Sequence, residues 1–502
     1  MTHPESKSVT SPISHRQFLL GATLSSLIAI VYAKALGFAE SVVVARILGG
    51  REFGLLTLVL SITSLVVALS TLGIPSALTK FLSGEASASQ TAARKTLAVS
   101  LRVVILSTFV ASVCSIAVTV SVLGSYYQAP EAAPLILTGI VVAGISSPIL
   151  LFANALQGLK QVTRLNVLTM IAGTAGLVLA VLLSLAWGVQ GAVIAFLVVA
   201  ALPGILSIRF VRSSIRSLPN IDGRGMIAPR ALLNYGLPTV VSGLIVLSAT
   251  YLLNSWLAVG IGLSDLGDFA VASSLAAAIG FIPAAIGVPL VPVLSSLSVD
   301  DPQRGRAVVP RVMRVITFVS VSLGVLMISF APEILAATYG PEYSAAALPL
   351  VVLTLASTLA ATTGVVGSHI AGAGRMWLGL GVNVVWSTTI VVAGFQLIPR
   401  YGAIGAGVSM LVGYGVLAMA ILALGARRLG LNYTGMGGPA IWSSFALTLA
   451  VLASTQSSNY RLPAAIIIVI AVICTALILL RPDERALVRD AIALASRNRR
   501  TQ

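Results

Sequence analysis

Charged residues are scarce in this sequence, since Asp, Glu, Lys and Arg make up only 9% of its 502 residues, against about 25% in a soluble domain. Cysteine is almost absent, and Cys114 and Cys474 both lie in apolar stretches, which offers neither a disulfide framework nor a metal site. We also find no paired carboxylates, no glycine-rich nucleotide-binding loop and no Ser/His/Asp set. The sequence therefore predicts a protein that is not an enzyme and that needs no metal or cofactor.

Apolar residues dominate what is present, at 57% of the chain with a mean hydropathy of +1.01. A soluble protein of this composition would lack the polar surface to cover its core, so we expect the bilayer to be its solvent. At about 20 residues per crossing plus short loops, the chain has room for roughly 14 crossings. The net charge of +16 agrees with the positive-inside rule, and we expect no nucleic-acid partner.

The apolar runs are long and do not alternate with polar residues, which excludes a barrel of outer-membrane type. We predict an all-α, polytopic membrane protein with 14 transmembrane helices. The predicted spans cover residues 17–45, 53–80, 93–123, 132–157, 164–187, 189–209, 231–260, 268–297, 310–331, 344–371, 376–398, 402–426, 438–456 and 462–480.

The basic residues predict the orientation of these spans. If the N-terminus is cytoplasmic, 26 of the 31 Lys and Arg residues fall on the cytoplasmic side, and Lys34 lies within the first span. Only Arg46, Arg51, Arg400 and Arg461 fall outside. One missed helix would invert every later loop, so this asymmetry supports the fourteen-span assignment. We expect a multi-pass protein of the cytoplasmic membrane with both termini in the cytoplasm.

The chain contains an internal repeat at an offset of 213 or 214 residues. Any single match is weak because the chain has 45 glycines, but several matches in order at nearly one offset are hard to obtain by chance. The paired segments are Leu48–Gly54 with Ile261–Gly267, Gly73–Pro75 with Gly287–Pro289, Gly158–Lys160 with Gly372–Arg375, and Gly188–Ala192 with Gly402–Ala406. Six spans separate the members of each pair, so the repeats share one orientation and are related by an axis along the membrane normal.

This repeat predicts two six-helix lobes, an N-lobe at 17–210 and a C-lobe at 231–428, with a cleft between them. A basic linker at 211–230 joins the lobes, spans at 429–480 stand outside the repeat, and polar tails cover 1–16 and 481–502. Two such lobes are typical of alternating-access carriers, in which the lobes rock about a central site. The alternative is a purely structural helix bundle.

Several segments resemble one transporter family. They are Ala45–Gly49 with Glu52–Gly54, the Tyr235–Pro238 start of span 7, and the small-residue turn His369–Arg375. The sequence is similar over residues 17–480 to the polysaccharide-biosynthesis (Wzx-type) flippases of the multidrug/oligosaccharidyl-lipid/polysaccharide exporter superfamily. The resemblance implies export of a lipid-linked oligosaccharide across the cytoplasmic membrane, for assembly of a surface polysaccharide or glycan.

Such a substrate has an anionic polyprenyl phosphate or diphosphate, so the cleft would need cationic groups. Lys34 lies deep in the first span, where an unpaired cation is costly, and we predict that it contacts the phosphate. The alternative is an ion pair with Glu40. Arg46 is a second candidate, and the alternative is an interfacial anchor or a structural pair with Glu52.

Carboxylates within spans are candidates for coupling transport to a proton or sodium ion. Glu40 and Asp268 lie within or at the edge of a span without an adjacent basic residue. Asp268 also suits the start of span 8 as a charge at a helix N-terminus. Other polar residues in spans, among them Asn254, Ser273 and Ser274, fit hydrogen bonds between helices.

Prolines within spans break the helical hydrogen-bond pattern and are candidates for gating. We predict kinks at Pro75 and, in span 8, at Pro283, Pro289 and Pro292; the alternative is a static bend that lines the cleft.

The sequence thus leads to a flippase whose partners are a lipid-linked oligosaccharide, membrane lipids and a proton or sodium ion, and which acts as a monomer. A cation-coupled small-molecule or drug antiporter of the same superfamily would share the fold. A membrane glycosyltransferase is disfavoured because it needs acidic catalytic residues and usually a long outer loop.

Overall fold

The computed structural model describes residues 12–84, 89–123, 126–127, 129–220, 229–281, 302–372, 376–455 and 458–480, and the regular elements in these ranges are all helices. The longest are α1 (Pro12–Thr71), α6 (Val162–Arg216) and α13 (Met376–Leu429). The other α-helices are α2 (Ile74–Ser83), α3 (Gln90–Val118), α5 (Ala132–Gly158), α7 (Pro229–Gly260), α8 (Leu263–Ala277), α10 (Pro302–Ser329), α11 (Ala331–Thr338), α12 (Ala347–Gly372), α14 (Gly437–Ser454) and α15 (Ser458–Leu479).

Each of the three longest helices contains a sharp break at a glycine. The breaks lie at Gly49 (φ 75°, ψ 170°), Gly188 (φ 55°, ψ −136°) and Gly402 (φ 54°, ψ −132°). Positive φ is the region that glycine adopts without a Cβ penalty. At these points the chain reverses, so one long helix supplies two spans.

Twelve stretches of the described chain are long and apolar enough to cross a membrane. Two of them, Ala29–Thr71 with 43 residues and Trp377–Leu429 with 53, are about twice as long as one crossing needs. They contain the breaks at Gly49 and Gly402. Divided there, the stretches number fourteen, which confirms the predicted all-α fold with 14 membrane helices.

The backbone repeats the offset that the sequence predicts. Gly188 and Gly402, 214 residues apart, have nearly identical φ and ψ values. A Cβ built on Gly191 would lie 1.9 Å from the Leu183 carbonyl oxygen, and one on Gly405 would lie 2.3 Å from that of Leu397. Both pairs of spans therefore make the same tight turn.

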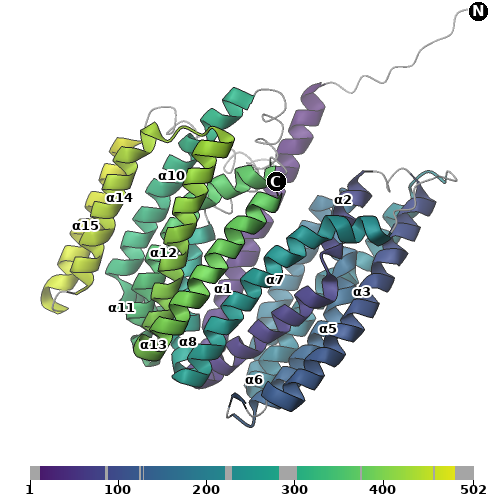
Figure 1. Ribbon diagram of the computed structural model, residues 1–502, viewed down its shortest axis with the longest axis horizontal. Helices are drawn as coiled ribbons and strands as arrows, with labels where there is room; N and C mark the ends of the chain where they lie inside the picture. Colours follow the sequence, from purple (N-terminus) through teal and green to yellow (C-terminus); the bar gives the residue numbers. More distant parts are fainter. Residues whose placement is uncertain are drawn as a thin grey trace, which may run out of the picture.

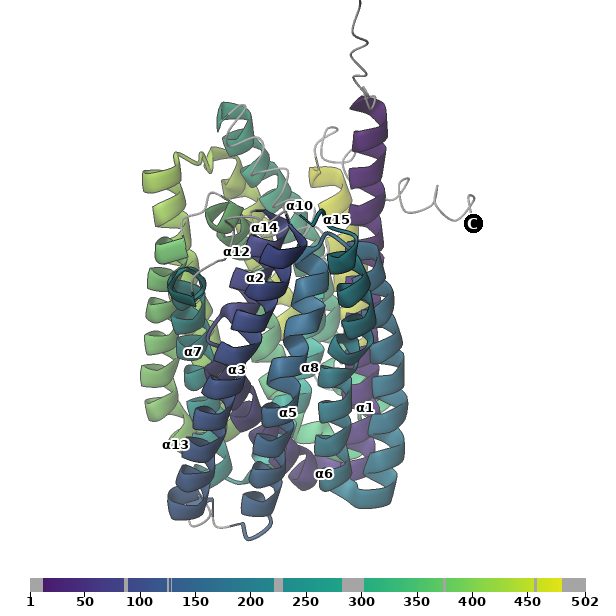
Figure 2. The same ribbon diagram turned by 90° about the vertical axis from the view of Figure 1, so that its right-hand side faces the viewer.

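The helices form two groups with a shared seam (Figure 1). On one side α3, α5 and α6 pack with α1, and α2 packs with α5; on the other α12 packs with α8 and α10, and α13 with α7 and α12. The last two helices, α14 and α15, pack against α10 at the edge of the molecule. Figure 2 shows the helices running between two ends of the bundle. We call the end that carries the turns at Gly49, Gly188, Gly262 and Gly402 the far face, because it lies opposite the start of α1.

At the far face the two lobes touch through glycines. A Cβ on Gly54 would lie 1.9 Å from the Leu263 carbonyl oxygen, and one on Gly267 would lie 2.0 Å from that of Gly50. These two contacts interchange under the 213-residue repeat, so α1 and α8 cross near the pseudo-two-fold axis. Glycine at both positions lets the backbones approach, which is how membrane helices associate without a hydrophobic driving force.

Of the four prolines predicted to kink helices, only Pro75 lies in the part of the chain that the structure describes. Pro75 lies in the first turn of α2, where a missing N–H costs nothing. The break between α1 and α2 is produced instead by positive φ at Leu72 (46°) and Gly73 (67°). Pro283, Pro289 and Pro292 lie outside the described residues.

Candidate functional site

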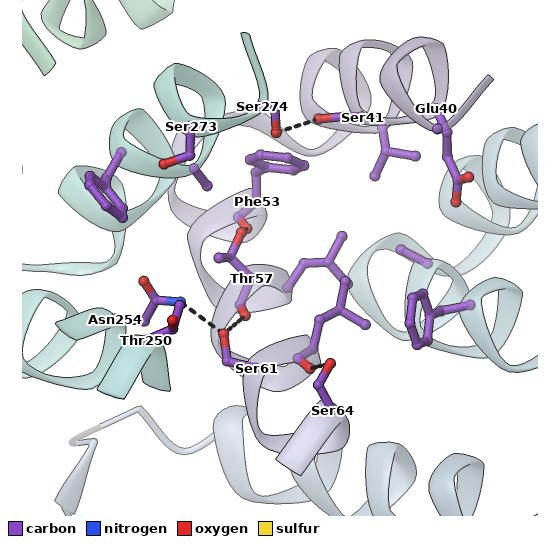
Figure 3. Close-up of a pocket in the computed structure, with 18 of the residues that line it drawn as sticks. Glu40, Ser41, Phe53, Thr57, Ser61, Ser64, Thr250, Asn254, Ser273 and Ser274 are labelled. Atoms are coloured by element: carbon purple, nitrogen blue, oxygen red, sulfur yellow. Dashed lines mark hydrogen bonds between the residues drawn. The ribbon is translucent and has the colours of Figure 1, made fainter. Parts of the chain in front are cut away.

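A cavity of about 670 Å³ lies at the seam between the lobes. Helices of both lobes line it: α1 on both sides of its Gly49 break and α6 from one lobe, and α7, α8 and α13 from the other. Figure 3 shows its polar side chains converging from these helices. They are Glu40, Ser41, Thr57, Ser61, Ser64, Thr250, Tyr251, Asn254, Ser273 and Ser274.

One wall of the cavity is a hydroxyl stripe on the second span. Thr57, Ser61 and Ser64 recur every three or four residues and so share one helix face. Each hydroxyl donates to the carbonyl four residues earlier, at 2.9 Å for Thr57 and 2.8 Å for Ser61 and Ser64. With their protons used by the backbone, these oxygens present acceptor lone pairs to the cavity.

Hydrogen bonds across the cavity join the lobes. Asn254 Nδ2 of α7 donates to Ser61 Oγ at 2.8 Å. Ser41 Oγ of α1 donates to Ser274 Oγ of α8 at 3.2 Å and lies 3.0 Å from the Tyr339 hydroxyl. These contacts agree with the prediction that Asn254 and Ser274 bond between helices. They also place both residues at the cavity.

Glu40 is the one charged side chain that the described lining contains. Within the described chain no hydrogen bond or ion pair holds its carboxylate. Lys34 is exposed, makes no ion pair with Glu40 in the described structure, and does not line the cavity. It lies one helical turn before Gly37, a lining residue, and therefore towards the cavity side of α1.

Arg46 lies at the far face rather than in the cavity lining. Its guanidinium crosses to the other lobe, where Nε donates to the Thr338 carbonyl and Nη2 to the Ala337 carbonyl, both at 2.6 Å. These carbonyls end α11, and a cation is favourable at the negative end of a helix dipole.

Arg51 pairs with Glu131 at 2.5 Å and not with Glu52. A hydrogen bond from its own backbone, together with Arg51, lowers the pKa of Glu131.

Asp268 lies on α8 half-buried and outside the cavity lining. The acidic residue that faces a helix start is Asp265, whose Oδ1 would lie 3.3 Å from a Cβ on Gly402. Glu52 corresponds to Asp265 in the repeat, and its Oε2 would lie 3.8 Å from a Cβ on Gly188. In each lobe a carboxylate therefore lies at the start of the helix that follows the glycine turn.

A set of bonds at the far face completes the closure between lobes. The Tyr127 hydroxyl, in the connection between α3 and α5, lies 2.8 Å from the Tyr251 hydroxyl and 3.0 Å from Ser255 Oγ. The Tyr343 hydroxyl donates to the Ala45 carbonyl at 2.9 Å. Burial raises the pKa of Tyr127, so its hydroxyl stays protonated at physiological pH.

Sequence reasoning missed most of the cavity lining. Ser41, Thr57, Ser61 and Tyr251 received no role, because serine and threonine are common in membrane helices. The three- and four-residue spacing of Thr57, Ser61 and Ser64 is the signal that would have found them.

Membrane-spanning helices packed in two groups around a cavity define this protein as a multi-pass membrane transporter. The sequence matches the family model described as polysaccharide biosynthesis protein over residues 19–298, more than half of the chain. The protein therefore belongs to the polysaccharide biosynthesis protein family, as its motifs predict. Among curated proteins, no sequence matches this chain.

Solved structures share the fold. A lipid II flippase MurJ in an inward closed conformation aligns with a TM-score of 0.71 and 13% identity, over 93% of this chain and 99% of that one. An inward-facing multidrug resistance transporter of the MATE family aligns with a TM-score of 0.58 and 17% identity, over 82% and 98%. A MOP-superfamily transporter from Pyrococcus furiosus aligns with a TM-score of 0.56 and 15% identity, over 82% and 96%. At these identities the likeness concerns the fold alone.

Proposed function

We propose that this protein moves a lipid-linked oligosaccharide from the inner to the outer leaflet of the cytoplasmic membrane, for assembly of a surface polysaccharide or glycan. Transport proceeds by alternating access, in which the N-lobe and C-lobe rock about the cavity. The observation that carries the proposal is the cavity of about 670 Å³ at the seam, whose lining includes eight hydroxyl side chains and the Asn254 amide among apolar residues.

The chemistry of this lining suits a sugar. Thr57, Ser61 and Ser64 offer oxygen acceptors, and sugar hydroxyls supply the matching donors. The volume falls within the roughly 300–1,000 Å³ of ligand sites. In the closed arrangement Ser61 and Ser41 bond to the opposite lobe, and a sugar entering the cavity would replace those partners.

The phosphate contacts remain assigned to Lys34 and Arg46. Lys34 is exposed one helical turn closer to the start of α1 than the cavity lining. A phosphate that follows the sugar into the cavity would reach it there. Arg46 becomes available only when the lobes separate at the far face, because Nε and Nη2 now donate to α11 carbonyls. Lys34 would then act while the cavity is open to the cytoplasm, and Arg46 while it is open to the outside.

A second candidate function is a cation-coupled small-molecule or drug antiporter. Glu40 favours it, since an unpaired carboxylate in a cavity without a lining Lys or Arg suits a cationic ligand or ion. In the flippase, Glu40 and Asp268 would instead hold the proton or sodium ion that drives transport.

Deletion of the gene in its source organism distinguishes these functions. We expect the deletion strain to accumulate lipid-linked glycan in the inner leaflet and to lose surface glycan, both restored by the wild-type gene. Mass spectrometry of the lipid extract would identify the substrate. Unchanged lipid-linked and surface glycan with altered drug resistance would reject the flippase and support the antiporter.

A further inference from the structure

A second hollow lies on the outside of the lobe seam, where the second span of α1 meets α3 and α7. Its volume is about 710 Å³. Its lining consists almost wholly of apolar side chains, from Ile62 to Leu72 on α1, from Val103 to Thr119 on α3 and its π-helical end, and Tyr251 of α7. We call this hollow the lateral groove.

The lateral groove offers little polar surface, from Ser107, Ser115, Thr119 and Tyr251. The Ser107 hydroxyl donates to the Val103 and Ser70 carbonyls, and the Thr119 hydroxyl donates to the Ser115 carbonyl. Leu106 and Val110, by contrast, are 66% and 53% exposed. A ligand of the groove must therefore be a hydrocarbon.

The groove runs along the membrane normal. Its α3 wall covers the seventeen residues from Val103 to Thr119, whose ends lie about 24 Å apart along the helix at a rise of 1.5 Å per residue. The hydrocarbon core of a bilayer is about 30 Å thick. An extended lipid chain in the groove would thus stay within hydrocarbon across most of the membrane.

The groove adjoins the sugar cavity. The second span is their common wall: Thr57, Ser61 and Ser64 face the cavity, while Leu65 and Leu69 face the groove. Tyr251 lines both hollows, and its hydroxyl bonds to Tyr127 at the far face. A molecule with a polar head and an apolar tail would therefore find adjacent sites for its two parts.

We infer that the lateral groove holds the polyprenyl tail of the same lipid-linked substrate whose sugar occupies the cavity. This inference rests on the proposed function and adds the route of the tail. Because the bilayer is as apolar as the groove, the affinity for the substrate comes mainly from its phosphate and sugar, and the groove determines where the tail lies. It keeps the tail beside the cavity while the head group crosses the membrane. Tyr251 lies between the groove and the cavity.

Two valines on α3 provide a matched test. Val110 lines the groove and Val113 does not, and they are 53% and 50% exposed on the same helix. In the deletion strain, Val110→Trp should lower export of the lipid-linked glycan about tenfold, which corresponds to ~1.4 kcal/mol. Val113→Trp should restore export as the wild type does, with both variants present in the membrane at equal amounts.

A binding experiment on the purified wild-type chain keeps the inference testable even if Val110→Trp fails to fold. The probe is a polyprenyl phosphate with a photoreactive benzophenone on its chain, in phosphatidylcholine vesicles. Crosslinked peptides should map to 103–119, and unlabelled polyprenyl phosphate should compete. Peptides of α15, which is exposed and carries Cys474, serve as the control for nonspecific lipid contact.

Three results separate the possible failures. Equal export by Val110→Trp and Val113→Trp in a strain that does accumulate lipid-linked glycan would overturn the groove assignment and leave the proposed function intact. Labelling of 103–119 by photoreactive phosphatidylcholine without competition by polyprenyl phosphate would show ordinary membrane lipid in the groove and overturn it too. A deletion strain with unchanged lipid-linked glycan would instead reject the proposed function.

Discussion

The charged residues within the first span separate into two kinds of site. Glu40 faces the cavity without a partner, whereas Lys34 is exposed one turn closer to the start of α1. An ion pair between them would have neutralised both in the resting protein. Their separation leaves each available for a different task, and we propose an anion contact for Lys34 and a cation or proton for Glu40.

Charge reversal tests Lys34. We expect Lys34→Glu to lower glycan export at least about tenfold, because a carboxylate would repel a phosphate where the ammonium attracts it. Lys95→Glu is the control, since Lys95 is an exposed basic residue of α3 far from the cavity lining. Export is measured as surface glycan in the complemented deletion strain. Wild-type export with Lys34→Glu would show that Lys34 does not contact the phosphate.

Neutralisation tests Glu40. Glu40→Gln keeps the size of the side chain and removes its charge, so transport should become independent of the proton or sodium gradient and fall about tenfold. Glu342→Gln changes an exposed carboxylate at the far face and should have no effect. The measurement is uptake of lipid-linked substrate in vesicles with imposed gradients. Unaltered gradient dependence in Glu40→Gln would remove Glu40 from the coupling mechanism.

Two kinds of contact between helices close the seam of the two lobes at the far face. Hydrogen bonds from Tyr127 and Tyr343 join side chains of one lobe to the other. Glycine contacts between α1 and α8 bring backbones together at Gly54 and Gly267. The bonds can break and reform as the lobes rock, while the glycines determine how closely the helices approach.

Removal of one hydroxyl should weaken the closure. Tyr127→Phe loses the bonds to Tyr251 and Ser255, and at about 1 kcal/mol per bond the open far face gains roughly fivefold to thirtyfold in population. In a Cys114→Ser, Cys474→Ser background, Ser61→Cys should then react faster with an impermeant thiol reagent added at the far face.

Tyr126→Phe is the matched control, because Tyr126 is exposed beside Tyr127 and the structure assigns its hydroxyl no bond across the seam. Because burial raises the pKa of Tyr127, its hydroxyl stays protonated at neutral pH. The hydrogen bonds from Tyr127 to Tyr251 and Ser255 should therefore be insensitive to pH between 6 and 9. Equal labelling in both variants would show that Tyr127 does not hold the lobes together.

An added methyl group should disturb the glycine contact. Gly54→Ala places a Cβ 1.9 Å from the Leu263 carbonyl oxygen, and overpacking of this kind costs about 1–3 kcal/mol. We expect a lower melting temperature in detergent and faster labelling of the cavity from the far face. Gly243→Ala, with no atom within 4 Å, should keep or raise stability. A Gly54→Ala protein as stable and as closed as the wild type would contradict the contact.

At the scale of the whole molecule, charge predicts which way the fourteen spans face. The far face carries Arg46, Arg51, Arg400 and Arg461, and the positive-inside rule predicts that it lies outside the cell. The closed seam would then lie on the external side, and the structure would represent a transporter shut towards the outside.

Labelling of single cysteines tests this orientation. Ser217 and Glu342 are exposed at opposite ends of the bundle. In the cysteine-free background, Glu342→Cys should react with an impermeant reagent added to intact cells, and Ser217→Cys only after the cells are permeabilised. Tyr343, although adjacent, is fully buried and unsuitable as a probe. The reverse pattern would invert the topology and the proposed direction of transport.

The sequence alone determined the number of spans, the repeat and the family. These properties depend on local apolar length and on glycine spacing, which the chain displays directly: Gly49, Gly188 and Gly402 mark the turns at the places where the backbone breaks. Family motifs such as Ala45–Gly49 are equally local, and the family match confirmed them.

Only the tertiary structure decided which side chains share the cavity. Ser41 meets Ser274 and Tyr339 across 233 and 298 residues, and Ser61 meets Asn254 across 193. Arg46 lies outside the cavity lining because its guanidinium donates to the carbonyls at the end of α11. Contacts of this kind depend on the crossing of α1 with α7 and α8. That crossing follows from the packing of two lobes about Gly54 and Gly267, which no short stretch of sequence encodes.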